Sequence, residues 1–203
     1  MKKFLMALTT ALTMTGALAQ TGTANPNTAV KQAVETVVKA AKADPASRAG
    51  DVLATVKVVE RDFLPYTDFR RTTRLAVGAA WNKATPAQQQ QLFEQFQTVL
   101  VHTYALQLTQ LRGQELTFHF SPATLSANGT DAVVNTRVSG SGDDLEVGYR
   151  LGRTSEGWKI YDIDMMGAWL IQIYRQQFAD QIARNGIDGL IKYLAAHNAR
   201  FGK

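Results

Sequence analysis

Residues 145–165 read LEVGYRLGRTSEGWKIYDIDM, with large apolar side chains at every second position through most of both halves. A period of two is typical of β-strands, and Ser155-Glu156-Gly157 between the halves is typical of a tight turn. The same alternation recurs upstream, where Asn128-Gly129 and residues 139–144 supply the turns. The predicted strands span residues 116–120, 134–138, 145–151 and 158–165. Because short connections join them, we expect an antiparallel meander of four strands.

Helical periodicity flanks these strands on both sides. Apolar residues recur every third or fourth position, as in amphipathic helices, and the predicted helices span residues 29–43, 46–63, 68–80, 86–112, 168–185 and 187–198. Thr85-Pro86-Ala87-Gln88 has the pattern of a capping box with proline at the first helical position. The element order predicts an α+β fold, in which helices pack on one face of a curved four-stranded sheet and enclose an apolar cavity.

The N-terminus has the pattern of an export signal. Lys2 and Lys3 precede an apolar run from Phe4 to about Leu12, and Ala17-Leu18-Ala19 matches a small-x-small cleavage site. We therefore expect residues 1–19 to be a signal peptide cleaved near Ala19, residues 20–28 to be a flexible leader, and residues 29–203 to form one domain in the periplasm. No stretch has the roughly twenty consecutive apolar residues of a membrane span.

Composition narrows the classes of function. The chain is 45% hydrophobic and 19% charged, which is typical of a globular protein, and it contains no cysteine, so a disulfide framework or thiolate site is excluded. Residues 1–19 carry two lysines and no acidic residue, so their removal lowers the formal charge from +5 to +3. The remaining basic residues are scattered rather than clustered, and nucleic acid binding is therefore not expected.

Few residues suggest catalysis. His102, His119 and His197 lie on three separate predicted elements without zinc-ligand spacing, so we expect no metal site. Asp162 and Asp164 share one face of a predicted strand, as paired catalytic carboxylates do. A small-substrate enzyme that uses Asp162 and His119 is therefore the alternative function, although such carboxylates are more often solvated side chains.

Apolar and aromatic residues give the stronger signal, because many of them have the periodicity of inward-facing positions on the sheet and the long helix. An ordinary core and a ligand cavity share this pattern. The candidate cavity residues are Phe96, Val99, Tyr104, Phe118, Phe120, Val134, Val147, Tyr149, Ile163 and Tyr174.

An ordered set of motifs resembles a known family. It begins with Phe63-Leu64-Pro65-Tyr66-Thr67-Asp68-Phe69 and covers nearly all of residues 29–203. Its other members are Thr73-Arg74-Leu75, Gly78, Trp81, Ala84-Thr85-Pro86 with Gln88, Leu100-Val101, Thr103-Tyr104-Ala105, Val147, Tyr149-Arg150-Leu151, Trp158-Lys159-Ile160-Tyr161-Asp162-Ile163, Tyr174-Arg175, Phe178 and Gly189-Leu190-Ile191. Together they resemble the MlaC family, also called the toluene-tolerance auxiliary component family.

The resemblance implies a periplasmic phospholipid carrier rather than an enzyme. Such proteins hold acyl chains in a deep apolar pocket with the headgroup near solvent, and the lipid is cargo rather than a cofactor. The implied partners are an outer-membrane lipoprotein–porin complex and an inner-membrane ABC transporter complex with an MCE-domain protein. Lipid exchange with them maintains outer-membrane lipid asymmetry, without stable membrane insertion of the carrier.

One segment departs from the family pattern. Family members commonly carry Glu-Gly-Val-Ser-Leu-Val-x-Asn-Tyr-Arg after the last strand, whereas residues 166–175 here read MGAWLIQIYR. A carboxylate, a hydroxyl and an amide are thus replaced by Met166, Trp169 and Ile173. Where these side chains face the cavity, we expect a more apolar interior or a reshaped mouth.

Overall fold

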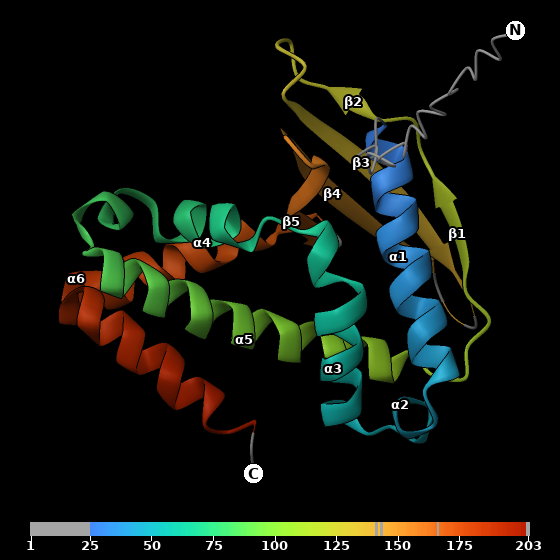
Figure 1. Ribbon diagram of the computed structural model, residues 1–203, viewed down its shortest axis with the longest axis horizontal. Helices are drawn as coiled ribbons and strands as arrows, with labels where there is room; N and C mark the ends of the chain where they lie inside the picture. The colour runs from blue at the N-terminus through green and yellow to red at the C-terminus, as the bar shows by residue number, and fades with distance from the viewer. Residues whose placement is uncertain (1–24, 141, 143, 166, 202–203) are drawn as a thin grey trace, which may run out of the picture.

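The computed structural model describes residues 25–140, 142, 144–165 and 167–201 (Figure 1). The expected signal peptide and Met166 lie outside the described residues. The helices are α1 (Pro26–Ala43), α2 (Pro45–Ala49), α3 (Val52–Asp62), α4 (Phe69–Val77), α5 (Pro86–Gln110) and α6 (Leu170–Asn198), with 3-10 helices at Leu64–Tyr66 and Gly78–Lys83. The strands are β1 (Thr117–Phe120), β2 (Thr124–Leu125), β3 (Asp131–Ser139), β4 (Leu145–Thr154), β5 (Gly157–Met165) and β6 (Ala168–Trp169).

The predicted antiparallel meander is confirmed. The strands pair in the order β1-β3-β4-β5-β6, and β2 pairs with β3 beside β1. Tyr149 at the centre of β4 lies opposite Val134 of β3 and Ile163 of β5. Four strands were expected and six are present. The two missed strands, β2 and β6, have only two residues each, too few to show an alternating pattern.

The helices form two groups beside the sheet (Figure 1). In the first, α1 packs against β3 and β5, and α3 contacts α1 and the second half of α5. In the second, α4 and α6 pack against each other, against α5, and against β5 near the end of the sheet. Two apolar cores result, and Leu64, Tyr104 and Leu170 contact both of them. In the described part of the chain, no helix is long and apolar enough to cross a membrane.

Several predicted boundaries were wrong for identifiable physical reasons. The first helix begins at Pro26 instead of residue 29, because the Asn25 side chain accepts a hydrogen bond from the Asn27 N–H and caps it. Residues 26–28 of the expected leader are therefore helical. The single helix expected over 46–63 is divided into α2 and α3, because Gly50 is left-handed (φ 95°) and Asp51 starts a new helix as its N-cap.

The helix expected over 68–80 ends early. Helix α4 stops at Val77, where Gly78 has a φ of 67°, and the chain continues as a 3-10 helix. Helix α5 ends at Gln110, two residues before the predicted end. The predicted break at Gly186 is confirmed: this residue has φ 68° and ψ −174° and bends α6 into two segments.

Candidate functional site

An apolar cavity of about 140 Å³ lies between the sheet and the first group of helices. Helices α1, α3 and α5 form one wall, and the inner face of β1, β3, β4 and β5 forms the other. Its lining residues are Val34, Val37, Val38, Val59, Phe63, Tyr104, Gln107, Leu108, Leu111, Leu116, Phe118, Val138, Leu145, Val147, Tyr149, Ile163 and Met165.

The regular geometry of each element explains why these residues meet. On α5, Tyr104, Gln107, Leu108 and Leu111 have the spacing i, i+3, i+4, i+7 and therefore share one helix face. That face extends about 10 Å along the helix axis. On β4, Leu145, Val147 and Tyr149 alternate inward over about 13 Å. Tyr104 and Ile163, the residue opposite Tyr149, line one void at the first end of the rows, and Leu111 and Leu145 line one cleft at the other end. The two rows therefore share both ends of the cavity, which is an elongated slot.

The cavity lining carries no charge. Within the part of the chain that the structure describes, none of its lining residues is charged, and only Tyr104, Gln107 and Tyr149 contribute polar side-chain atoms. Burial raises the pKa of the Tyr149 hydroxyl, and burial is also the main cause that raises the pKa of Tyr104. Both phenols therefore stay protonated at neutral pH. Such a surface suits an uncharged hydrocarbon chain and disfavours an ion.

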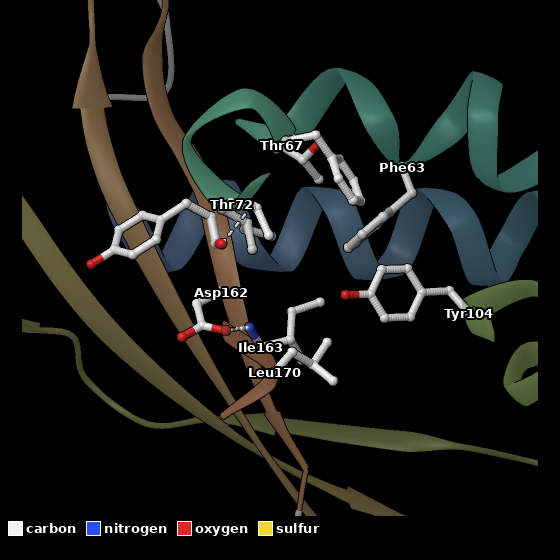
Figure 2. Close-up of a pocket in the computed structure, with 10 residues that line it drawn as sticks. Phe63, Thr67, Thr72, Tyr104, Asp162, Ile163 and Leu170 are labelled. Atoms are coloured by element: carbon white, nitrogen blue, oxygen red, sulfur yellow. Dashed lines mark hydrogen bonds between the residues drawn. The ribbon is translucent and has the colours of Figure 1, made fainter. Parts of the chain in front are cut away.

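Phe63, Tyr104 and Ile163 close the inner end of the cavity (Figure 2). The rings of Phe63 and Tyr104 meet edge to face with their centroids 6.0 Å apart. The same three residues also line a second void of about 10 Å³ on the far side, which Thr72 and Leu170 help to enclose.

Leu111 and Leu116 mark the outer end, where two further clefts adjoin the cavity. One of these clefts carries the basic residues Lys42, Arg48 and Arg112. Both clefts are lined by exposed residues, Arg112 and Gly113 in the first and Gly140 and Gly142 in the second. The cavity therefore opens toward solvent at Leu111 and Leu116.

Five of the ten candidate cavity residues line this cavity, namely Tyr104, Phe118, Val147, Tyr149 and Ile163. The other five do not. Val134 is fully buried in the first core, and Phe120 packs against the edge of that core. Phe96, Val99 and Tyr174 belong to the second core, because the first half of α5 packs against α6 instead of the sheet.

The sequence analysis missed the cavity residues of α1 and α3. Val34, Val37 and Val38 of α1 and Val59 and Phe63 of α3 form much of the helical wall. Their valine periodicity was visible as an amphipathic face. Periodicity alone does not say which helix covers which part of a sheet, so the long helix was assigned the whole wall.

Asp162 and His119, the residues of the alternative enzyme function, do not lie close together. Asp162 and Asp164 do share a face, but it is the face of the sheet opposite Val147 and Tyr149. The buried Asp162 carboxylate lies 3.1 Å from the Arg150 guanidinium, and its other oxygen accepts hydrogen bonds from the N–H groups of Ile163 and Ile171 at 3.0 Å each. His119 is on β1, three strand spacings from β5, or about 14 Å away.

The remaining histidines pack against an aromatic ring. His102 stacks on Phe201 with ring centroids 4.4 Å apart, and His197 meets the same ring edge-on at 5.1 Å. Among the described residues, no group of three or more His, Cys, Asp or Glu side chains has the arrangement of a metal site.

Among the described residues, the two side chains that depart from the family pattern, Trp169 and Ile173, do not line the cavity. Trp169 lies on the opposite face of the sheet, where its ring centroid is 3.8 Å from the guanidinium carbon of Arg150. Ile173 is 39% exposed on α6. These two side chains therefore do not face the cavity, so the condition for a more apolar interior or a reshaped mouth is not met by them, and Trp169 instead stacks on Arg150, the partner of Asp162.

Comparison with protein families identifies the chain. The model of the MlaC protein family matches residues 31–196. The chain belongs to the MlaC family. This match contains every residue that lines the cavity.

Two relatives extend the family assignment. A crystal structure of a phospholipid-binding protein from Ralstonia solanacearum, in complex with a phospholipid, is similar with a TM-score of 0.82 and 39% sequence identity, and the match covers 89% of this chain and 100% of that one. Toluene tolerance protein ttg2D from Pseudomonas putida is 34% identical over 107 residues, which are 52% of this chain and 48% of the relative. The chain thus matches about half the length of this curated relative.

Proposed function

We propose that this protein binds a phospholipid, with acyl chains in the cavity between sheet and helices and the headgroup at its outer end. The observation that carries this proposal is an elongated, uncharged cavity in a member of the MlaC family. A family relative of 39% identity and the same fold is described with a phospholipid bound. The basic side chains near Leu111 and Leu116 are also suitably placed for a phosphate group outside the apolar slot.

The proposed physiological role is carriage of phospholipid through the periplasm between the outer and inner membranes. Each buried methylene contributes about 0.8 kcal/mol, so a chain of sixteen carbons favours the cavity over water by on the order of 12 kcal/mol. Release into water is therefore extremely slow, and unloading requires direct transfer into another apolar site. The outer-membrane lipoprotein–porin complex and the inner-membrane ABC transporter with its MCE-domain protein are the proposed exchange partners, with maintenance of lipid asymmetry as the outcome.

The first experiment measures bound lipid. The full chain is expressed with its own N-terminus, purified without detergent, extracted with organic solvent and analysed by mass spectrometry. We expect phospholipid in stoichiometric amount. A folded, monodisperse sample with a clean extract would argue against the proposal.

Substitutions on one strand locate the lipid. Val147→Glu places a carboxylate in the cavity and is expected to remove bound phospholipid, whereas Val147→Leu keeps the wall apolar and should retain it. Arg153→Glu places a carboxylate at an exposed position of β4, with an even larger change of net charge (−2 instead of −1), and serves as the control. Circular dichroism establishes that each variant is folded. Lipid retained by a folded Val147→Glu variant would place the binding site elsewhere.

Transport is tested separately with vesicles. The protein is expected to move a labelled phospholipid from donor to acceptor vesicles, and Val147→Glu to be inactive in the same assay. Binding without transfer would support the cavity as a lipid site and contradict the carrier role.

A further inference from the structure

Two aromatic rings form the boundary between the cavity and the void beyond it. Phe63, directly after the end of α3, and Tyr104, in the second half of α5, line both spaces, and Ile163 of β5 completes the boundary from the sheet (Figure 2). Phe63 and Ile163 are each 7% exposed. Tyr104 is partly buried, so the boundary is made of two buried side chains and one partly buried ring from three different elements.

The void beyond this boundary is too small to continue an acyl chain. Its volume of about 10 Å³ is at the lower limit for a single water molecule. Thr72 and Asp162 are among the residues that line it, and Thr72 donates a hydrogen bond from its hydroxyl to the Tyr161 carbonyl oxygen at 2.6 Å. With the two rings in place, the apolar slot ends at Phe63 and Tyr104.

The direction of the slot determines which part of a lipid reaches this boundary. The cavity opens to solvent at Leu111 and Leu116, and a charged headgroup must remain at that end because its burial in an uncharged cavity is strongly unfavourable. The methyl end of an acyl chain therefore points toward Phe63 and Tyr104.

We propose that Phe63 and Tyr104 act as a stop that sets the longest acyl chain the cavity accepts. The inference rests on the proposed phospholipid-binding function. A chain longer than the slot leaves its excess methylenes in water at the mouth. Each methylene that moves from water into the slot changes the binding ratio by up to about fourfold, so a shift of the stop alters chain-length preference measurably.

The experiment is a competition for chain length. Purified protein is incubated with vesicles that contain equal amounts of phosphatidylethanolamines whose acyl chains lengthen two carbons at a time from dodecanoyl to icosanoyl. After re-isolation, mass spectrometry gives the bound distribution. Phe63→Ala and the milder Phe63→Leu open the inner end, whereas Ile163→Phe fills it from the sheet.

A matched control separates the stop from general loosening of the fold. Phe178 is 1% exposed in the second core, where its ring centroid is 4.9 Å from that of Phe96, and it does not line the cavity. Phe178→Leu removes the same atoms as Phe63→Leu and should leave the bound distribution unchanged.

We expect the Phe63 variants to shift the bound distribution toward longer chains, by up to about fourfold in the ratio of neighbouring species for each extra methylene buried, and Ile163→Phe to shift it toward shorter ones. If the variants load phospholipid with the wild-type distribution, the stop is refuted while the binding function stands. If the wild-type protein takes up no phospholipid from any vesicle, the binding function itself is refuted, and the stop with it.

Discussion

Asp162 illustrates how a single buried carboxylate can serve the fold. One of its oxygens accepts hydrogen bonds from the backbone at Ile163 and at Ile171 in the first turn of α6, and the other pairs with Arg150, whose guanidinium stacks on Trp169. These contacts tie the start of α6 to β4 and β5. Asp162 is 2% exposed, and burial raises the pKa of its carboxyl, with the Ile171 N–H and Arg150 opposing the rise.

The raised pKa gives a pH-dependent prediction. A carboxyl with a folded-state pKa above its unfolded value near 3.8 contributes stability that is complete below that value and declines as the pH rises through the folded pKa. Asp162→Asn removes this decline. We therefore expect the free energy of unfolding of the wild type, relative to the variant, to fall as the pH rises from below 3.8 toward neutrality.

Urea denaturation at acidic and neutral pH measures this difference. Asp180→Asn, the same substitution at an exposed position of α6, provides the control. If the free energy of unfolding of the wild type, relative to that of Asp162→Asn, increased with pH, the raised pKa of Asp162 would be contradicted.

At the residue scale, the sequence predicted the strand half of the site better than the helical half. Phe118, Val147, Tyr149 and Ile163 do line the cavity, because a period of two leaves only two faces to choose from, and the apolar face is the buried one. Phe96 was misplaced, since a long helix can pack its two halves against different partners. Which partner covers which turn depends on tertiary packing that local periodicity does not encode.

At the scale of elements, the capping box at the start of α5 combines several local signals. The Thr85 hydroxyl accepts from the Gln88 N–H at 3.2 Å, the Gln88 side chain accepts from the Thr85 N–H at 2.9 Å, and Pro86 occupies the first turn. Helix α5 contributes to both cores, so its N-terminal register affects the whole domain. This motif could be recognised in the sequence because all of its residues lie within a stretch of four.

Removal of the cap is expected to cost about 1 kcal/mol. Thr85→Ala leaves the Gln88 N–H without its acceptor, and chemical denaturation should show a lower midpoint with an unchanged slope. Thr98→Ala, at a partly buried position in the same helix where the hydroxyl donates only to the Glu94 carbonyl oxygen, is the matched control and should be neutral or slightly stabilising. Equal effects of the two substitutions would argue against a capping role for Thr85.

Gly186 has a backbone conformation that is essentially restricted to glycine. Its φ of 68° and ψ of −174° divide α6 into two segments. We expect Gly186→Ala to destabilise the fold by about 1–3 kcal/mol, measured by thermal or urea unfolding. Gly142, at which an added Cβ meets nothing within 4 Å, is a suitable comparison for the same substitution. A Gly186→Ala variant as stable as the wild type would show that the bend tolerates a side chain.

Other element boundaries depended on features that a local pattern does not reveal. The irregularity between β4 and β5 puts Tyr161 outside the regular pairing, with Arg150 opposite Asp162 and Leu151 opposite Ile160. It shifts the alternation within one strand. Similarly, Gly50 and Asp51 break a continuous apolar pattern into α2 and α3 through backbone conformation and capping. The element types were predictable, whereas such breaks depend on one or two residues.

At the scale of the whole molecule, the two cores are joined rather than separate. Leu64, Tyr104 and Leu170 contact both, and Tyr104 also lines the cavity. Trp81 is buried in the second core and Trp158 in the first. We expect the cores to unfold in one cooperative transition, so that tryptophan fluorescence of Trp81→Phe and Trp158→Phe variants gives coincident midpoints. Two separated midpoints would indicate independent domains.

Phospholipid binding should raise the free energy of unfolding of the folded protein. Ligand at about one hundred times its dissociation constant adds roughly 2.7 kcal/mol, which for a chain of this size raises Tm by about 5–10 °C. Calorimetry of loaded and delipidated protein measures the difference. Val147→Glu should have the same Tm with and without lipid, and a lipid-dependent rise in that variant would contradict the site.

The positions of the cavity residues along the chain determine when during synthesis the cavity can form. Its first residues, at Val34, Val37 and Val38 of α1, and its last, at Ile163 and Met165 of β5, are separated by more than half of the polypeptide. A chain that has emerged only as far as β3 lacks the two strands that complete the slot, and its apolar residues face water. Such a fragment is exposed to aggregation and proteolysis until the β4–β5 hairpin arrives. Cargo can therefore be acquired only after synthesis of the sheet is complete, and truncation before Leu145 should be cleared as a misfolded product.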